Sequence, residues 1–162
     1  VGHLETFDDK QLKSVGKGDV DLGTDEERKE AEEARKDKAE SHASLIKLIE
    51  SNLEEHVKEV RFSNRLTSSA VCLVGGDNDM SPGLERMLRQ SGQAMPAQKR
   101  IMELNADHAL VDTMKTLFDA NAEDETLVDY AHLLYGQALI AEGASVPDPA
   151  GFARRVAALM VR

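Results

Sequence analysis

The apolar residues in the middle of this chain recur at the spacing of one helix face. They are Met80, Leu84, Met87 and Leu88. Ser81 suits the N-cap of such a helix, Pro82 its first position, and Gly92 its C-terminal stop. The stripe is either core or a surface kept for a partner. Periodicity alone favours core, because burying each of these side chains is worth about 1.5–3 kcal/mol.

Three short apolar segments predict the strands of a small sheet. They cover residues 57–63, 70–74 and 101–104. In the first segment Val60 and Phe62 share one face. The second is an unbroken apolar run that stops at Gly75 and Gly76, as expected for a buried strand.

Two further helices are predicted between and before these strands. Thr24 and Glu27 form a capping box, which opens a helix that is charged to Glu40 and then amphipathic. The apolar positions of its second half are Leu45, Leu48, Ile49, Leu53 and Val57. Asn105 is a plausible N-cap for the other helix. Its apolar face consists of Leu110, Met114, Leu117 and Phe118.

The last part of the chain is helical throughout. Residues 123–142 are apolar nearly all round, so every side of this helix must be covered. After Gly143, Asp148 and Pro149 open a final helix with one apolar stripe. The two helices form an αα-hairpin that either folds back on the sheet or pairs with a second copy in a four-helix bundle.

We expect the second arrangement, a two-fold dimer. The predicted interface residues are Leu127, Tyr130, Ala131, Leu134, Tyr135, Ala138, Phe152, Val156, Leu159 and Met160. The helical pattern does not say which of them face a partner and which face the chain's own core. With the three strands, the predicted fold class is α+β. Residues 1–24 are predicted to be an arm and residues 25–162 the folded domain.

Composition narrows the function. The 162 residues carry a formal net charge of −10, which argues against nucleic acid and anionic membrane surfaces as partners. The single Cys72 excludes an internal disulfide and fits a reducing compartment, so we expect a cytoplasmic protein and a buried structural thiol. No signal peptide or run of 18 apolar residues is present. The start at Val1 suggests a piece of a longer protein.

Catalytic patterns are missing from the sequence. It has no phosphate-binding loop, no paired cysteines and no Gly-x-Gly-x-x-Gly, and Gly75-Gly76-Asp77 is better interpreted as a turn. His3, His42 and His56 lack the spacing of metal ligands, and His108 near a helix start is expected to cap the helix or lie on the surface. We therefore expect neither enzyme activity, nor a metal, nor a bound cofactor in this chain.

Several segments in order resemble the 90-kilodalton heat-shock protein chaperones, and specifically their bacterial members. These segments are Leu4–Asp8, Lys13–Val15, Val57–Arg61, Arg65–Ala70, Ile101–Leu110, Glu123–Leu139 and Asp148–Met160. The first two resemble the end of that family's middle domain and the others its C-terminal dimerisation domain. Ala106 and Ala109 stand where the family often has proline.

The resemblance implies an ATP-driven clamp for partly unfolded client proteins. ATP and magnesium would bind in a part of the parent that this chain lacks. Here it implies a homodimer through the last two helices and client contact by Met80, Leu84, Met87 and Leu88. With it, we expect that stripe to be partly exposed. An interaction module that only dimerises is the alternative, and an ATPase of this chain alone is a third hypothesis.

Two departures from the family bear on these expectations. Pro82 and Gly83 occupy the first turn of the client helix, where they would weaken or shorten it. The chain ends in Met160-Val161-Arg162 and not in the acidic pentapeptide that recruits tetratricopeptide co-chaperones. We therefore expect no partner of that class.

Overall fold

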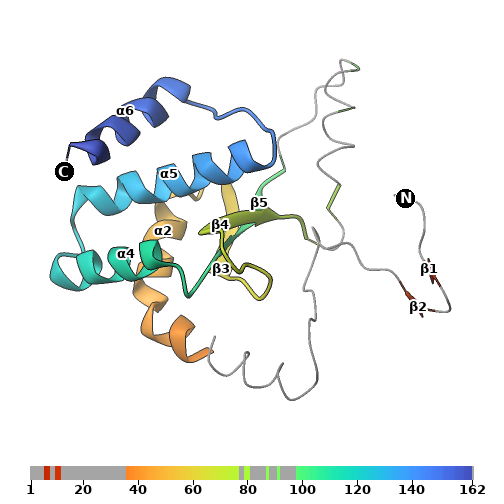
Figure 1. Cartoon of the computed structure of the whole chain (residues 1–162), viewed down its shortest axis with the longest axis horizontal. Helices are drawn as coiled ribbons and strands as arrows, with labels where there is room; N and C mark the ends of the chain where they lie inside the picture. The colour runs from red at the N-terminus through yellow and green to blue at the C-terminus, as the bar shows by residue number, and fades with distance from the viewer. Residues whose placement is uncertain are drawn as a thin grey trace.

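A computed structural model gives the fold shown in Figure 1. It describes the backbone of residues 6–7 and 10–11, and residues 36–76, 79–80, 87, 91 and 98–161. The capping box at Thr24 and most of the predicted arm, residues 1–24, lie outside the described residues. Within that arm, β1 (Thr6–Phe7) pairs antiparallel with β2 (Lys10–Gln11).

The main sheet has three strands in the order β3-β5-β4. They are β3 (Val57–Phe62), β4 (Val71–Val74) and β5 (Arg100–Leu104). The central strand β5 runs parallel to β3 and antiparallel to β4, so the sheet is mixed. All three strands fall where the apolar segments predict them, and the α+β fold class is confirmed.

Residues 36–41 are helical, and four longer helices complete the described part of the domain. They are α2 (Ala43–Asn52), α4 (Ala109–Ala120), α5 (Glu125–Ala141) and α6 (Pro149–Met160). Helix α5 packs on β4 and α2, and α6 lies on the far side of α5 from the sheet (Figure 1). The predicted αα-hairpin of α5 and α6 is therefore present. No described helix is long and apolar enough to cross a membrane.

The core is aliphatic and lies between the sheet and the helices α2, α4 and α5. Its largest fully buried apolar side chains are Leu45, Ile49, Leu53, Met102, Leu104, Val111, Met114, Leu127 and Leu134. Every side chain of β5 from Ile101 to Leu104 is buried, as expected for a strand paired on both edges. One of these residues, Glu103, is charged.

Two helix boundaries differ from the prediction. Asn105 does not cap α4, because its side chain accepts a hydrogen bond from Asp107 N in the preceding turn. His108 is the N-cap, and its Nδ1 accepts from Leu110 N at 3.1 Å. The predicted continuous helix up to Val57 is interrupted at His42 and ends at Asn52. Val57, which the sequence placed both on this helix face and at the start of a strand, begins β3 and pairs with Arg100 of the central strand.

Other helix ends match the expected residues. Asp148 caps α6 by accepting from Gly151 N at 2.9 Å, and Pro149 is its first residue. Gly143 follows the end of helix α5 and has a φ of 72°, a conformation that glycine adopts without steric cost. The loop between the two helices is thus defined at both ends by local sequence.

Candidate interaction surface on the C-terminal helices

The inner face of α5 belongs to the chain's own core. Its residues are Leu127, Ala131, Leu134 and Ala138, each no more than 1% exposed. Their spacing of four, three and four residues follows one side of the helix. Four of the ten predicted interface residues are therefore buried before any second copy is present, which leaves little of their surface for a partner.

Two tyrosines flank this inner face and are only partly covered. Tyr130 and Tyr135 pack against the edge of the core. The ring of Tyr135 stacks on His56 with centroids 5.1 Å apart, and burial raises the pKa of its hydroxyl. Both side chains keep part of their surface available for contact outside the chain.

Helix α6 is covered on one side only. Gly151 is its only buried residue, while Phe152, Val156 and Leu159 are half-buried. Met160 at its end is 80% exposed. Helical geometry places Val156 and Met160 on the side turned away from Gly151 and Arg155. The apolar stripe predicted for α6 is present, and its own chain covers it incompletely.

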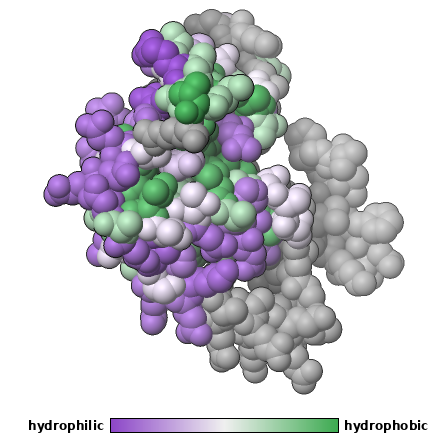
Figure 2. All heavy atoms as spheres, turned by 60° about the vertical axis from the view of Figure 1, so that its left-hand side comes forward, coloured by the Kyte–Doolittle hydropathy of each residue, from purple (hydrophilic) through white to green (hydrophobic). Residues whose placement is uncertain are grey.

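Helix α5 also carries an exposed apolar side chain. Ile140, near the end of α5, is 53% exposed. Figure 2 shows the face brought forward from the left of Figure 1, where apolar residues gather among charged ones. Scattered exposed apolar residues are ordinary, but a helix stripe that stays uncovered marks a contact surface.

One polar contact and one close approach join the two helices. Arg155 of α6 donates from Nε to Oδ1 of Asp129 in α5 at 3.1 Å. The ring of Phe152 lies directly over Gly136 of α5. Beside them is a cavity of about 220 Å³, also lined by His56 and His132.

His132 lies at this boundary between the helices. Burial, then the positive charge of Arg155 and then His56, lower its pKa below the usual range. The two imidazole rings have centroids 6.4 Å apart in an edge-on arrangement. The neutral imidazole is therefore the form that the packed hairpin favours.

The predicted client-binding residues are described only in part. Leu84 and Leu88 lie outside the described residues. Met87 is helical and 59% exposed, and Met80 is half-buried, with its backbone N–H donating to Oε1 of Gln98 at 3.2 Å. The helix and its stripe therefore stay a prediction.

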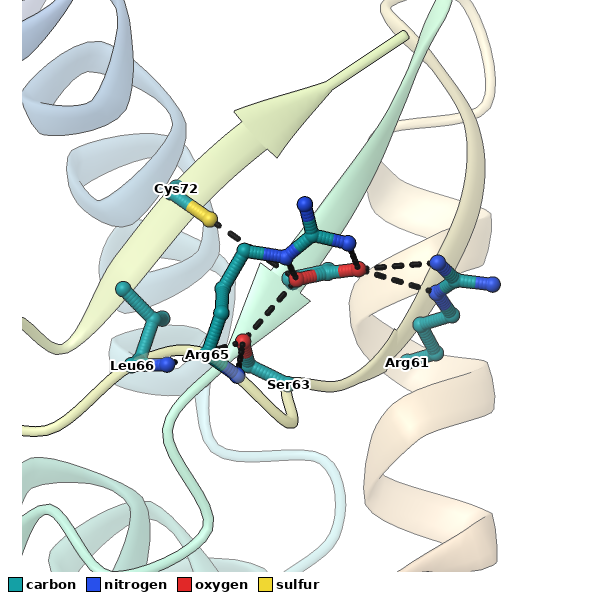
Figure 3. Close-up of polar contacts among 6 residues, drawn as sticks. Arg61, Ser63, Arg65, Leu66 and Cys72 are labelled. Carbon is teal, nitrogen blue, oxygen red and sulfur yellow. Dashed lines mark hydrogen bonds and ion pairs between the residues drawn. The ribbon is translucent and has the colours of Figure 1, made fainter. Parts of the chain in front are cut away.

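A buried charge cluster on the sheet escaped the sequence analysis. Glu103 is 1% exposed, and Arg61 donates to its Oε1 from Nη2 at 2.8 Å (Figure 3). Arg65 Nε lies 2.9 Å from Oε2, and Ser63 Oγ donates to the same oxygen at 2.9 Å. A carboxylate between two guanidinium groups ties β3, the following turn and β5 together. The only sign of this charge cluster in the sequence is Glu103 itself, a charged residue within the apolar segment 101–104.

Cys72 lies at the edge of this cluster. Its Sγ is 3.9 Å from Oε2 of Glu103. Burial first, and then the negative charge of Glu103, raise the pKa of the thiol to about 11. The raised pKa favours the protonated thiol at neutral pH, and Cys72 is half-buried and not fully buried as expected.

The described residues do not form a metal site. Among them, no group of three or more histidine, cysteine, aspartate or glutamate side chains could hold a metal ion. The cavity beside Phe152 contains imidazole, guanidinium and carboxylate groups without a nucleophile and base in hydrogen-bonding contact. The features that stand out are thus surfaces and buried charge.

Comparison with known proteins assigns the family. The family described as Hsp90 protein matches residues 1–162, so this chain belongs to the Hsp90 family. It is 48% identical over 157 residues to the chaperone protein HtpG of Frankia casuarinae, covering 97% of this chain and 24% of that protein. It is 46% identical over 161 residues to HtpG of Geobacter sulfurreducens, covering 99% of this chain and 25% of that protein.

A mycobacterial relative is similar over the whole chain as well. The chain is 44% identical over 164 residues to HtpG of Mycobacterium tuberculosis, covering all of this chain and 25% of that protein. The chain thus spans about a quarter of the length of the curated relatives it matches. The resemblance stated from the sequence segments is confirmed at the level of the family.

Proposed function

We propose that this chain is the C-terminal dimerisation domain of an ATP-dependent chaperone of the HtpG type. The observation that carries the proposal is the apolar stripe of α6, which its own chain leaves partly uncovered. An isologous contact about a two-fold axis would place this stripe, with the outer side of α5, against its copy. The four helices would then form a bundle.

The exposed residues divide the ten predicted interface positions into two groups. Tyr130, Tyr135, Phe152, Val156, Leu159 and Met160 have surface left for a partner. Ile140 joins this group although the sequence prediction omitted it. The buried inner face of α5 supports the bundle from below and makes little direct contact with the second copy.

Sedimentation equilibrium of the chain tests the dimer. The wild-type chain is expected to show a concentration-dependent mass that reaches twice the monomer mass. Met160→Glu places a charge on each side of the two-fold contact and is expected to raise the dissociation constant about tenfold or more. Because Met160 is 80% exposed, the variant keeps its fold.

Ala158→Glu is the matched control. It adds the same charge to an exposed position of α6, on the opposite side of the helix from Met160. It is expected to leave the dissociation constant unchanged within about threefold, since it stays outside the contact. A wild-type chain that is monomeric at every concentration would overturn the proposal.

We further propose that Met80, Leu84, Met87 and Leu88 contact partly unfolded client proteins. Support comes from Met87, which is helical and mostly exposed. Methionine is the adaptable side chain of surfaces that bind varied partners. In the full-length chaperone, Met87→Glu is expected to reduce suppression of heat-induced luciferase aggregation without changing the dimer mass. Unchanged suppression would favour the alternative, a domain that only dimerises.

ATP and magnesium are proposed to act elsewhere in the full-length chaperone. The resemblance to the family supports this assignment. Calorimetric titration of ATP and magnesium into the 162-residue chain is expected to give no binding heat. A saturable heat of binding would contradict it and revive the hypothesis of an ATPase in this chain.

A further inference from the structure

The contact between α5 and α6 depends on a glycine in the middle of a helix. A Cβ atom built on Gly136 would lie 2.5 Å from Cδ2 and 2.7 Å from Cε2 of Phe152. These distances are far below van der Waals contact. The aromatic ring therefore occupies the space that any side chain at position 136 would need, and α6 approaches α5 closely at this point.

Glycine has a cost at this position. Inside a helix it is less favourable than alanine by about 1 kcal/mol. Gly136 is buried and lies inside α5, more than one helical turn before its last residue, Ala141. The space above it is filled by one half-buried ring, so the glycine serves the position of α6 and does not serve the stability of α5 itself.

A second glycine seats the same end of α6. A Cβ on Gly151 would lie 1.9 Å from Oδ2 of Asp148, the residue that caps the helix. Phe152 follows directly. The first turn of α6 is thus placed by two close approaches, one within the helix and one to α5. Arg155, one turn further on, adds its hydrogen bond to Asp129.

We propose that Gly136 is the positioning residue that sets the distance and angle of α6 on α5, and thereby orients the α6 stripe that pairs with a second copy. The proposal rests on the dimer described above. Phe152 is the only large side chain in the first turn of α6, so its ring carries the contact of that turn with Gly136 of α5. Val156 and Met160 lie further along that helix, so a change of angle displaces them from their partner surface.

Gly136→Ala separates this role from a general effect on folding. Alanine favours the helix, so α5 itself gains while the ring of Phe152 must move. The variant chain is expected to stay folded, with an altered ring-current pattern around Phe152 in its NMR spectrum. Its dimer dissociation constant is expected to rise about tenfold or more, equivalent to ~1.4 kcal/mol.

Gln137→Ala is the control on the same helix. Gln137 is the adjacent residue and is exposed. Glutamine and alanine both favour helices, so this variant keeps the wild-type dissociation constant if only the contact at position 136 matters. Equal weakening by both variants would overturn the proposal.

A second substitution tests the mechanism. Phe152→Val removes the ring atoms that would collide with the methyl group introduced by Gly136→Ala. Alone it is expected to weaken the dimer, because it empties the contact over Gly136. Combined with Gly136→Ala it is expected to strengthen dimerisation relative to Gly136→Ala alone, which is a coupling of opposite sign. Additive weakening would overturn the proposal.

The same double variant covers a failure of Gly136→Ala to fold. Recovery of folding and dimerisation by Phe152→Val supports the proposal, and no recovery overturns it. A wild-type dimer that Gly136→Ala leaves unchanged contradicts this inference alone. A wild-type chain that never dimerises overturns the proposed function, and this inference with it.

Discussion

The two helices of the C-terminal hairpin differ sharply in how their own chain covers them. Helix α5 is sandwiched between β4 and α6, and its inner residues are almost inaccessible. Helix α6 packs mainly on α5 and has a single buried residue, Gly151. Both are apolar in sequence, so apolar content alone does not separate a core helix from an interface helix. What separates them is the layer of the fold in which each helix lies.

The largest expected effect lies in the buried interior, at Glu103. Glu103→Ala leaves the guanidinium groups of Arg61 and Arg65 close together without the carboxylate between them. Removing one partner of a buried ion pair costs about 3–5 kcal/mol. Urea unfolding of the chain measures this loss. A loss below about 1 kcal/mol would show that the cluster does not hold the sheet together.

On α5, Leu134→Ala is expected to cost about 2–5 kcal/mol of unfolding free energy, because it opens a cavity in the core. The contrasting change on α6, Met160→Ala, is expected to cost less than about 0.5 kcal/mol in dilute, monomeric protein. Urea unfolding at low concentration compares the two. Similar losses would remove the distinction between the helices.

Removing the aspartate N-caps of α5 and α6 compares the same two helices, with a smaller expected effect. Asp124 caps α5 by accepting from Thr126 N at 2.8 Å, and Asp148 caps α6 through Gly151 N. Replacing either by alanine costs about 1 kcal/mol. We expect Asp124→Ala to lower global stability and Asp148→Ala to increase amide exchange in α6 first. Exchange that rises equally in both helices after Asp148→Ala would contradict this.

The smallest expected effect is a pH dependence at the boundary between the helices. The pKa of His132 is lowered in the folded chain, chiefly by burial. Below its unfolded value of about 6.5, the unfolded chain binds a proton that the folded chain resists, so stability falls as pH decreases through this range. Arg155 and His56 oppose the added charge, whereas Asp129 favours it.

Unfolding of His132→Gln at about pH 8 and about pH 5.5, on either side of the ordinary histidine pKa, checks this dependence. The variant is expected to lose less stability than wild type over that interval. An equal loss in both proteins would assign the pH dependence to other groups. The other imidazole of the cavity, His56, is present in both proteins.

Local signals predicted the elements better than their contacts. The run Val71–Val74, the cap at Asp148 and the stop at Gly143 are each encoded within a few residues, and the structure has them. Val57 fitted both the helical periodicity before it and the strand predicted over 57–63, and pairing of β3 with β5 decided between the two. The partner strand β5 lies far along the sequence, so no local pattern makes that choice.

The candidate site shows the same limit. The sequence marked α5 as apolar nearly all round but could not assign its faces, and packing of α5 on β4 and α2 makes that assignment. Asn105 and His108 were both plausible caps, and the turn that uses Asn105 left His108 for the helix. Gly136 was not singled out from the sequence, where it is one glycine within a largely apolar helix. Its partner Phe152 became apparent from packing.

The central claim is that a second copy covers the side of the hairpin that this chain leaves exposed. Hydrogen exchange of the chain at low and high protein concentration tests it most directly. We predict that amides of α6 become more protected as concentration rises, while those around Leu134 in α5 are already protected at both concentrations. Protection in α6 that does not depend on concentration would contradict the claim.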